Sequence, residues 1–295
     1  MTSQRGIALI QVLLISGIIG LLMLQIGLTA REQVARAEAL AQRADLQLKA
    51  QSHESAIVFS MLTQPLIARP ESANPYAAAW NFMGRPFVVN DVTFRLQDES
   101  GRLRVPHYGS EDFEKLLVGI GVEAGRARRL GQQLLSLQGT APRLRALGED
   151  SAMAGSSPSA PLPLQVLQEL RLLPDMDEEL YLRVKPLLTL YPTPGFNPLT
   201  APGELLNSRM SDSQLAGVLE ARQSGELDQL AYWRLTGIEA DETSSFATGP
   251  AVTVELELEG MDARVQRTTT FIVRPYTVVP LAVWQRTAES DGNSR

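Results

Sequence analysis

The first 62 residues contain the feature that most limits how this chain can fold. Residues 7–28 hold 22 consecutive positions without a charged side chain, and about 20 apolar residues are enough to cross the hydrocarbon core of a bilayer. Residues 31–62 follow without proline or glycine and are rich in Ala, Leu, Gln, Glu and Arg, which favour helix. We therefore expect one continuous helix over residues 7–62, about 84 Å long at ~1.5 Å per residue.

The second half of this segment is amphipathic. Its apolar positions recur at spacings of three and four, which is the period of one helix face, and the first residue that breaks the pattern is Pro65. The positions on this line are Val34, Ala37, Ala41, Ala44 and Leu48, continued by Ser52, Ala56 and Phe59. The pattern predicts a helix that lies half in lipid and is half docked on a folded domain.

The flanks of the apolar run indicate its orientation. Arg5 stands just before the run, so the positive-inside tendency places the N-terminus in the cytoplasm and the rest of the chain on the other side of the membrane. A cleaved signal peptide is the competing interpretation. Such peptides have an apolar region of about 7–15 residues and small residues at the cleavage site. Here the run is longer, and Leu28 would occupy the −3 position, so a retained helix is favoured.

A short leader that ends in Gly6, followed by a hydrophobic helix that begins at Ile7, resembles the N-terminus of prepilin-type proteins. The resemblance implies cleavage between Gly6 and Ile7 and N-methylation of Ile7. Most such proteins carry Glu at the fifth mature position, where this chain has Gln11. A carboxylate in an apolar region is costly unless it is paired, and Gln11 cannot pair with a neighbouring subunit's amine. Gln11 thus fits a subunit that starts or caps a fibre, or it is simply a tolerated polar residue.

The composition removes several classes of function. The formal charge is −6, from 27 basic and 33 acidic residues, which argues against nucleic-acid binding by phosphate neutralisation. The chain has no cysteine and 2 histidines, so thiol nucleophiles, disulfides and cysteine-ligated or multi-histidine metal sites are excluded. The sequence contains no nucleophile elbow or phosphate loop. We therefore expect no enzymatic activity.

Strand patterns flank a long helical stretch. Residues 85–105 read as a hairpin around Asn90-Asp91 with a second turn at residues 98–101, and residues 251–287 alternate as further strands. Between them, residues 111–240 read as short helices with proline and glycine connections. The expected fold class is α+β: a long N-terminal transmembrane and amphipathic helix packed on an antiparallel, pilin-like sheet, with a large all-helical insertion between strands.

The order of several stretches resembles type II secretion system protein K, a family of large minor pseudopilins. The stretches are VTFRLQDESGRLRV, LQELRLLPDMDEELYLRVKPLLTLYP, GFNPLTAPGELL with its Asn-x-x-Thr-Ala turn, and LEAR at residues 219–222. The insertion lacks a Trp-x-Asp-x-acidic stretch that many members carry, so it is read as shortened. The expected organisation is a leader (1–6), an N-terminal helix (7–62, transmembrane 7–28), a pilin-like α/β domain (63–108 and 245–287), a helical insertion domain (109–244) and a disordered tail (288–295).

The resemblance also implies a function. It predicts a minor pseudopilin that caps or initiates the pseudopilus tip and is needed for export of folded exoproteins across the outer membrane. The protein would cross the inner membrane once, with a periplasmic C-terminal domain. The implied partners are the minor pseudopilins I, J and H, the major pseudopilin and prepilin peptidase, with exoprotein substrate or the secretin as further candidates. The alternatives are a minor pilin of a type IV pilus or competence system and a generic single-span periplasmic protein.

One acidic cluster is a candidate metal site. Asp175, Asp177, Glu178 and Glu179 could bind calcium through carboxylate oxygens. The cluster lacks the spacing and central glycine of an EF-hand loop, and a helix cap at Asp175 or Asp177 with glutamates in the first turn explains it as well. We favour the cap and expect no cofactor, with calcium as the alternative. Asp98-Glu99 and Asp241-Glu242 are interpreted as turn acids.

Overall fold

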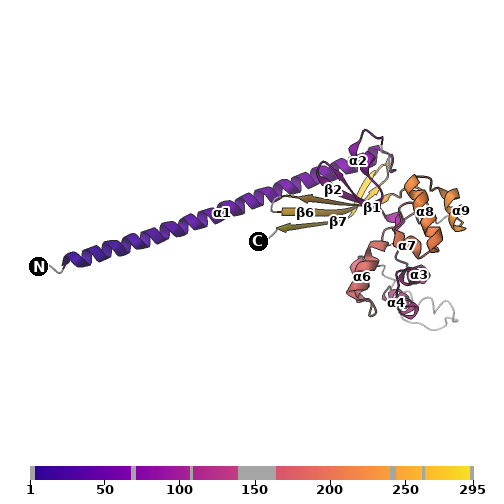
Figure 1. The fold of residues 1–295 in the computed structure, drawn as a ribbon, viewed down its shortest axis with the longest axis horizontal. Helices are drawn as coiled ribbons and strands as arrows, with labels where there is room; N and C mark the ends of the chain where they lie inside the picture. The colour runs from indigo at the N-terminus through magenta and orange to yellow at the C-terminus, as the bar shows by residue number, and fades with distance from the viewer. Residues whose placement is uncertain are drawn as a thin grey trace.

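The computed structural model describes residues 4–67, 71–106, 109–138, 164–239, 244–260 and 263–292. Its dominant element is helix α1, which runs from Gln4 to Thr63 and projects far beyond the body of the protein (Figure 1). At ~1.5 Å per residue its 60 residues measure about 90 Å. Pro65 follows the last turn and cannot extend the helix. The predicted continuous N-terminal helix is confirmed.

The body is built on a five-stranded antiparallel sheet with the order β1-β2-β5-β6-β7. Its strands are β1 (Met83–Val89), β2 (Val92–Asp98), β5 (Ala251–Glu259), β6 (Ala263–Val273) and β7 (Leu281–Gly292). The β1–β2 hairpin turns at Asn90 and Asp91, whose φ angles are 51° and 62°. Asn and Asp tolerate this left-handed region better than most residues, which makes them suitable for a tight hairpin turn.

The last turns of α1 and the short helix α2 (Pro75–Ala79) cover one face of the sheet. The helix lies over β5 and β6, and its residues Leu46, Ala50, Ile57 and Met61 are buried in the same core as alternate positions of β2 and β5. Phe94, Leu96, Val254 and Leu256 point into this core, as the period of two along a strand requires. The predicted α+β, pilin-like fold is confirmed.

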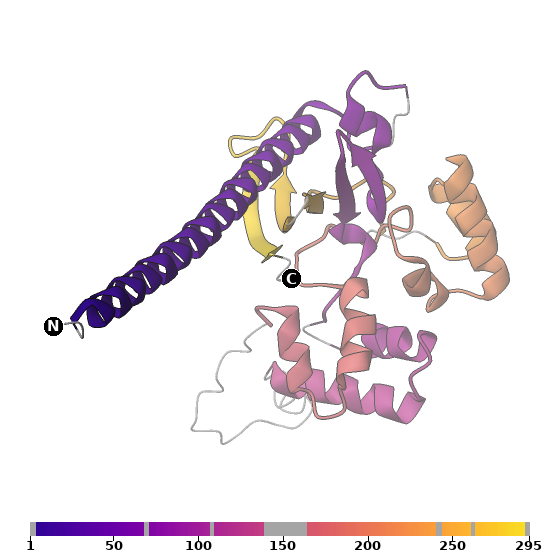
Figure 2. The same cartoon turned by 60° about the vertical axis from the view of Figure 1, so that its left-hand side comes forward.

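A long insertion separates β2 from β5 in the sequence. It holds η1 (Glu99–Gly101), β3 (Leu103–Arg104), α3 (Glu111–Gly119), α4 (Ala124–Leu137), η2 (Leu167–Leu172), α6 (Glu178–Val184), η3 (Lys185–Leu187), β4 (Leu188–Thr189), α7 (Gly203–Asn207), α8 (Asp212–Ser224) and α9 (Gln229–Thr236). Two clusters of buried side chains hold it together, one under α3, α4 and α6 and the other under α7, α8 and α9. Figure 2 shows the corresponding groups of helices on the side of the sheet away from α1.

Two details differ from the expectation. The insertion is not wholly helical, because β3 and β4 pair in parallel at Leu103–Leu188 and Arg104–Thr189. Strand β7 also continues along β6 to Gly292, into the segment 288–295 that was expected to be a disordered tail. The strand is longer than its sequence pattern because backbone pairing does not need apolar side chains at an edge.

Candidate functional site

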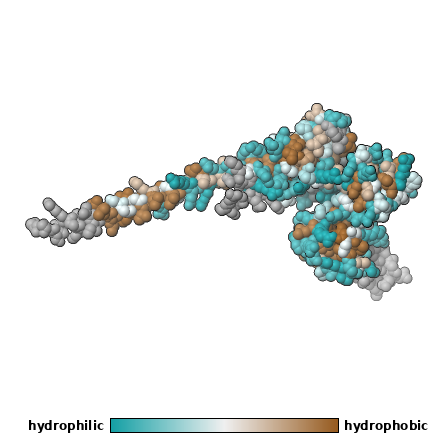
Figure 3. Space-filling view, in the orientation of Figure 1, coloured by the Kyte–Doolittle hydropathy of each residue, from teal (hydrophilic) through white to brown (hydrophobic). Residues whose placement is uncertain are grey.

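The first candidate surface is the part of α1 that leaves the body. Every residue from 11 to 41 is exposed, and an 18-residue window of this helix has a mean hydropathy of 2.3 with none of it buried. The window is long and apolar enough to cross a membrane, by length and composition. Figure 3 shows this hydrophobic stretch along the projecting half of the helix. Gln11 lies on it and is exposed, and Gly6 and Ile7 lie within the first turns of α1.

The second candidate surface is a line of exposed side chains farther along α1, which we call the free face. Its members are Val34, Ala37, Ala41, Ala44, Leu48 and Phe59. Val34, Leu48 and Phe59 are 57%, 67% and 64% exposed. At 3.6 residues per turn, this line lies on the side of the helix opposite Leu46, Ala50 and Ile57, which pack on the sheet. Of the apolar residues on the line predicted from the sequence, Ala56 is partly buried against the core, and the others face away from the sheet, so most of this line is not the docked one within this chain.

The docked face of α1 contains a charged residue that sequence reasoning passed over. Glu54 is 4% exposed, and its carboxylate accepts hydrogen bonds from Thr269 (2.6 Å) and Arg267 (2.9 Å) on β6. Arg286 of β7 adds a longer contact at 3.4 Å. A buried carboxylate is stable when it is paired and fully hydrogen-bonded. Glu54 therefore helps to orient α1 across the sheet. Because the docked side of α1 contains this charged residue, the pattern of apolar residues in the sequence did not identify it as the docked side.

The junction between the sheet and the insertion is organised by Asp98, which ends β2 and is fully buried. Its Oδ2 accepts hydrogen bonds from Asn197 Nδ2 and Thr200 Oγ1, both at 2.9 Å. Its Oδ1 accepts the backbone N–H groups of Ser100 and Gly249 at 2.9 and 3.2 Å. Three segments that are far apart in sequence therefore meet at one carboxylate. Asp98 does terminate a strand at a turn, but its role is wider than that of a turn acid.

The Asp-Glu-Ser-Gly and Asn-x-x-Thr-Ala stretches contact each other at this junction. Asn197 N–H donates to the carbonyl of Ser100 at 2.8 Å. A Cβ on Gly101 would lie 2.6 Å from the backbone carbonyl of Thr200. Only glycine allows this approach without a shift of the backbone. Two of the stretches that carried the sequence resemblance thus form one structural joint.

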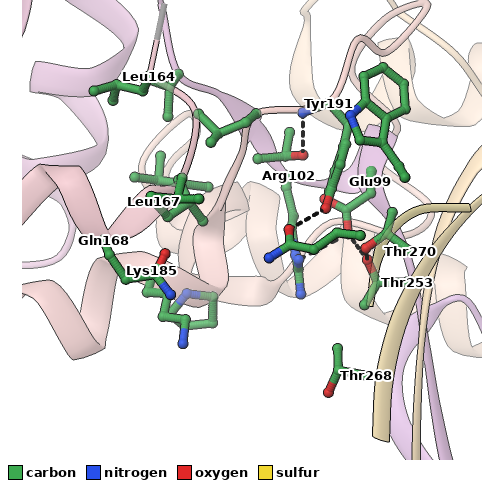
Figure 4. A pocket seen from close by; sticks show the side chains of 18 of the residues that line it. Glu99, Arg102, Leu164, Leu167, Gln168, Lys185, Tyr191, Thr253, Thr268 and Thr270 are labelled. Carbon is green, nitrogen blue, oxygen red and sulfur yellow. Dashed lines mark hydrogen bonds and ion pairs between the residues drawn. The ribbon is translucent and has the colours of Figure 1, made fainter. Parts of the chain in front are cut away.

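A cleft lies beside this joint, between the face of the sheet that α1 does not cover and the insertion. Its volume is about 1230 Å³. Glu99, Arg102, Tyr191 and Thr253 converge on one side, whereas Leu164, Leu167 and Lys185 lie on the other (Figure 4). We call it the junction cleft. The Tyr191 hydroxyl donates to Gln285 Oε1 at 2.7 Å, and burial raises the pKa of Tyr191. Because these residues come from distant segments, no local motif could have revealed the cleft.

The acidic cluster of residues 175–179 acts as a helix start. Asp177 is the N-cap of α6 and accepts the backbone N–H of Leu180 at 2.8 Å. This hydrogen bond, together with the contact from Arg126, holds the pKa of Asp177 below its usual range. A hydrogen bond from Arg129 likewise lowers the pKa of Asp175.

The partners of these carboxylates are cationic. Glu178 pairs with Arg171 at 2.5 Å. Within the residues that the structure describes, no three His, Asp or Glu side chains converge as a metal site would require. The hydrogen bonds of Asp177 at the start of α6 therefore agree with the interpretation of this cluster as a helix cap. Asp241-Glu242 and His107 lie outside the described residues.

Comparisons with known proteins place these features in context. Residues 89–193 match the family model described as type II secretion system (T2SS), protein K. A solved chain from the GspK–GspI–GspJ complex of the enterotoxigenic Escherichia coli type 2 secretion system has the same fold, with a TM-score of 0.50 and 16% sequence identity. The match covers 88% of this chain and 99% of that one. None of the curated proteins matches the sequence significantly. The predicted resemblance to protein K is confirmed.

Proposed function

We propose that this chain, with its protein K sequence pattern and its pilin-like fold, is a minor pseudopilin of a type II secretion system. The observation that carries the proposal is that much of the apolar surface of α1 is exposed. Its apolar first half and its free face have no partner among the described residues of the chain. A water-exposed helix of this composition needs lipid or other helices around it. A membrane-anchored subunit of a helical fibre supplies both.

The free face has the features of a helix-packing surface. Its positions follow the 3-4 spacing by which neighbouring helices interdigitate. The three central residues are Ala37, Ala41 and Ala44, and small side chains allow close approach of two backbones. Leu48 and Phe59 supply larger apolar area toward the body. We infer that helices of other minor pseudopilins, with I and J as the first candidates and H as a further one, pack along this line.

The position of the insertion supports a place at the tip of the fibre. The helices of the insertion lie at the end of the molecule opposite the N-terminus of α1 (Figure 1). A subunit stacked above would have to leave space for the insertion, whereas no subunit lies above it at the end of a fibre. Gln11 in place of the usual Glu removes a charge that a repeating subunit needs. We infer that the protein caps or initiates the pseudopilus and is needed for export of folded exoproteins across the outer membrane.

The same proposal fixes processing and topology. Prepilin peptidase would cleave between Gly6 and Ile7 on the cytoplasmic side, and residues 7–28 would hold the protein in the inner membrane with its body in the periplasm. The major pseudopilin would contact it below the tip, and exoprotein substrate or the secretin above. The role is structural, and the proposal assigns it no catalytic residue. Mass spectrometry of the purified protein tests the processing step: N-methylated Ile7 is expected, and retained Met1 would contradict it.

Secretion in cells tests the function. A strain that lacks the gene should keep its exoproteins in the periplasm, and the wild-type chain should restore secretion. Leu48→Glu places a charge on the free face, so it should restore little or none. Gln47→Glu adds the same charge at an exposed position off the free face and should restore it fully. Normal secretion in the deletion strain, combined with loss of twitching or DNA uptake, would instead identify a minor pilin.

A further inference from the structure

The loop that joins β6 to β7 carries apolar side chains that point into solvent. It covers residues 274–280, with the sequence RPYTVVP, and we call it the β6–β7 loop. Tyr276 and Val278 are fully exposed, and Val279 is 63% exposed. Single exposed apolar residues are normal on a protein surface, but three of them at one loop tip form a patch, and such patches mark sites of interaction.

The β6–β7 loop is held in shape by its own hydrogen bonds. Arg274 N–H donates to the carbonyl of Pro280 at 2.8 Å. The Thr277 hydroxyl lies 2.9 Å from the carbonyl oxygens of Arg274 and Val279. Pro275 and Pro280 each have a fixed φ angle. A loop that is already ordered loses little conformational entropy when it binds, so its exposed side chains can contribute most of their contact energy to affinity.

Tyr276 is an unfavourable residue for its place in the loop. Its φ angle is 67°, in the left-handed region that Gly and Asn occupy far more readily than a bulky aromatic residue. Because the side chain is fully exposed, no packing against the described residues offsets this cost. Strained residues of this kind cluster at functional sites. The aromatic ring is therefore free to contact another molecule.

The two edges of the docked face of α1 contact different parts of the body. Arg286 of β7 reaches the Glu54 carboxylate at 3.4 Å. His53 Nδ1 instead lies 3.2 Å from the hydroxyl of Tyr76 on α2. At about 100° per residue, positions 53 and 54 lie on opposite sides of the line that packs on the sheet. One edge of α1 therefore faces β7, and the other faces α2.

The edge that faces β7 leads around the helix to the free face. Val58 is buried on this edge, and Leu62 is partly buried against the same core. This core also receives Val273 and Leu281, which flank the β6–β7 loop. At about 100° per residue, Leu62 lies between the docked line and Phe59 of the free face. Figure 2 shows the loop, in yellow, at the last turns of α1 and away from β1 and β2. The loop and the free face thus lie on adjoining surfaces.

We propose that the β6–β7 loop is a second contact for the subunit whose helix packs on the free face, with Tyr276 and Val278 seated against an apolar surface of that subunit. The inference rests on the proposed function, because the free face identifies the partner. Two packed helices lie about 8–10 Å apart, so a helix on the free face brings its subunit beside the loop. A rigid group that includes an aromatic residue is a common form of interface hot spot.

Cross-linking in cells with a working secretion system tests the position of the loop. A photo-cross-linking amino acid is placed at Tyr276 or Val278, at Leu48 of the free face as the reference, and at Val88 as the control. Val88 is 63% exposed on β1, at the opposite edge of the sheet from β7. We expect adducts with the same protein from positions 276, 278 and 48, and few or none with that protein from position 88.

The outcomes separate this inference from the proposed function. Failure of positions 276 and 278 to label the protein that position 48 labels would overturn the inference and leave the function standing. Equal labelling of that protein from position 88 would do the same. Absence of pseudopilin adducts from all four positions would overturn both.

Substitutions in the loop distinguish binding from a structural role. Tyr276→Asn introduces a residue that favours the left-handed region, so the melting temperature of the full chain in micelles should be unchanged or slightly higher. In this variant the cross-linking yield from position 48 should fall about five-fold, as expected for an interface hot spot. Val278→Ser should lower the yield as well, whereas the matched control Val88→Ser should not. A lower melting temperature in Tyr276→Asn, or an unchanged yield, would overturn the proposal.

Discussion

Glu54 on α1 and Arg267 on β6 form an ion pair of 2.9 Å across the core that joins the long helix to the sheet. The side chains are 6% and 14% exposed, so this pair is shielded from water. Together with the apolar residues of α1 in the core, this pair fixes how the 60-residue helix is oriented relative to the body. The direction of the free face depends on that orientation.

Removal of one partner of this pair should loosen the helix. Glu54→Ala leaves Arg267 buried and unpaired, so the free energy of unfolding should fall by about 2–4 kcal/mol. The double variant Glu54→Leu with Arg267→Leu removes both charges and should recover most of that loss. Urea unfolding of the full chain in micelles, followed by the fluorescence of buried Trp80, measures both. Glu32→Ala, at an exposed pair of the same helix, is the control and should change little.

Substitution of the buried Asp98 should lower the stability of the protein. In Asp98→Asn an amide N–H₂ replaces one of the two carboxylate oxygens, and each of these oxygens accepts two hydrogen bonds: Oδ2 from Asn197 and Thr200, and Oδ1 from Ser100 and Gly249. At least one donor then loses its acceptor, and we expect a loss of about 2–4 kcal/mol. Faster trypsin cleavage within the insertion should accompany it. Asp91→Asn makes the same change at the exposed hairpin turn, where Asn is equally suitable, and should be neutral.

Gly101 tests the contact between the two motif stretches. In Gly101→Ala the new methyl group would meet the Thr200 backbone at 2.6 Å, so we expect a loss of about 1–3 kcal/mol in unfolding experiments. Gly203→Ala is the matched control. It lies in the first turn of α7 with nothing within 4 Å of the added Cβ, and it should be neutral or slightly stabilising. Equal effects at the two positions would contradict the account of the joint.

His53 should make stability depend on pH. Burial lowers the pKa of His53 from its usual 6.5, while its Nδ1 lies 3.2 Å from the Tyr76 hydroxyl. As pH falls through 6.5, the unfolded chain takes up the proton before the folded one, so stability should decrease until the lower folded pKa is passed. His53→Gln should remove this part of the pH dependence while matching the wild type at pH 8. An unchanged slope between pH 5 and 7 in the variant would contradict this assignment.

The sequence predicts individual helices and turns more readily than the contacts between distant segments. The uninterrupted run to Leu62 predicted α1, and Asn90-Asp91 predicted the hairpin, because both patterns are local. The docked face of α1 was not predictable in this way. Glu54 is buried there only because Arg267 and Thr269, more than 200 residues away, satisfy its carboxylate. An apolar count therefore selected the opposite side of the helix.

The candidate sites also differ in whether they have a local sequence signal. The cap at Asp177 was accessible from sequence, since an Asp before a helical pattern has a local reason. The junction cleft was not, because Glu99, Tyr191 and Thr253 come together only when three distant segments meet. Asp98 and Asn197 show an intermediate case: the motifs were recognised as a pattern, and the fold supplied the reason that they occur together.

The most direct test of the account asks what the free face of α1 contacts in cells with a working secretion system. A photo-cross-linking amino acid is placed at Ala41 or Leu48 of the full chain, and at Gln47 as the control position. We expect adducts with the N-terminal helix of another minor pseudopilin from positions 41 and 48, and few or none from position 47. Absence of pseudopilin adducts from both free-face positions, or equal adducts from position 47, would contradict it.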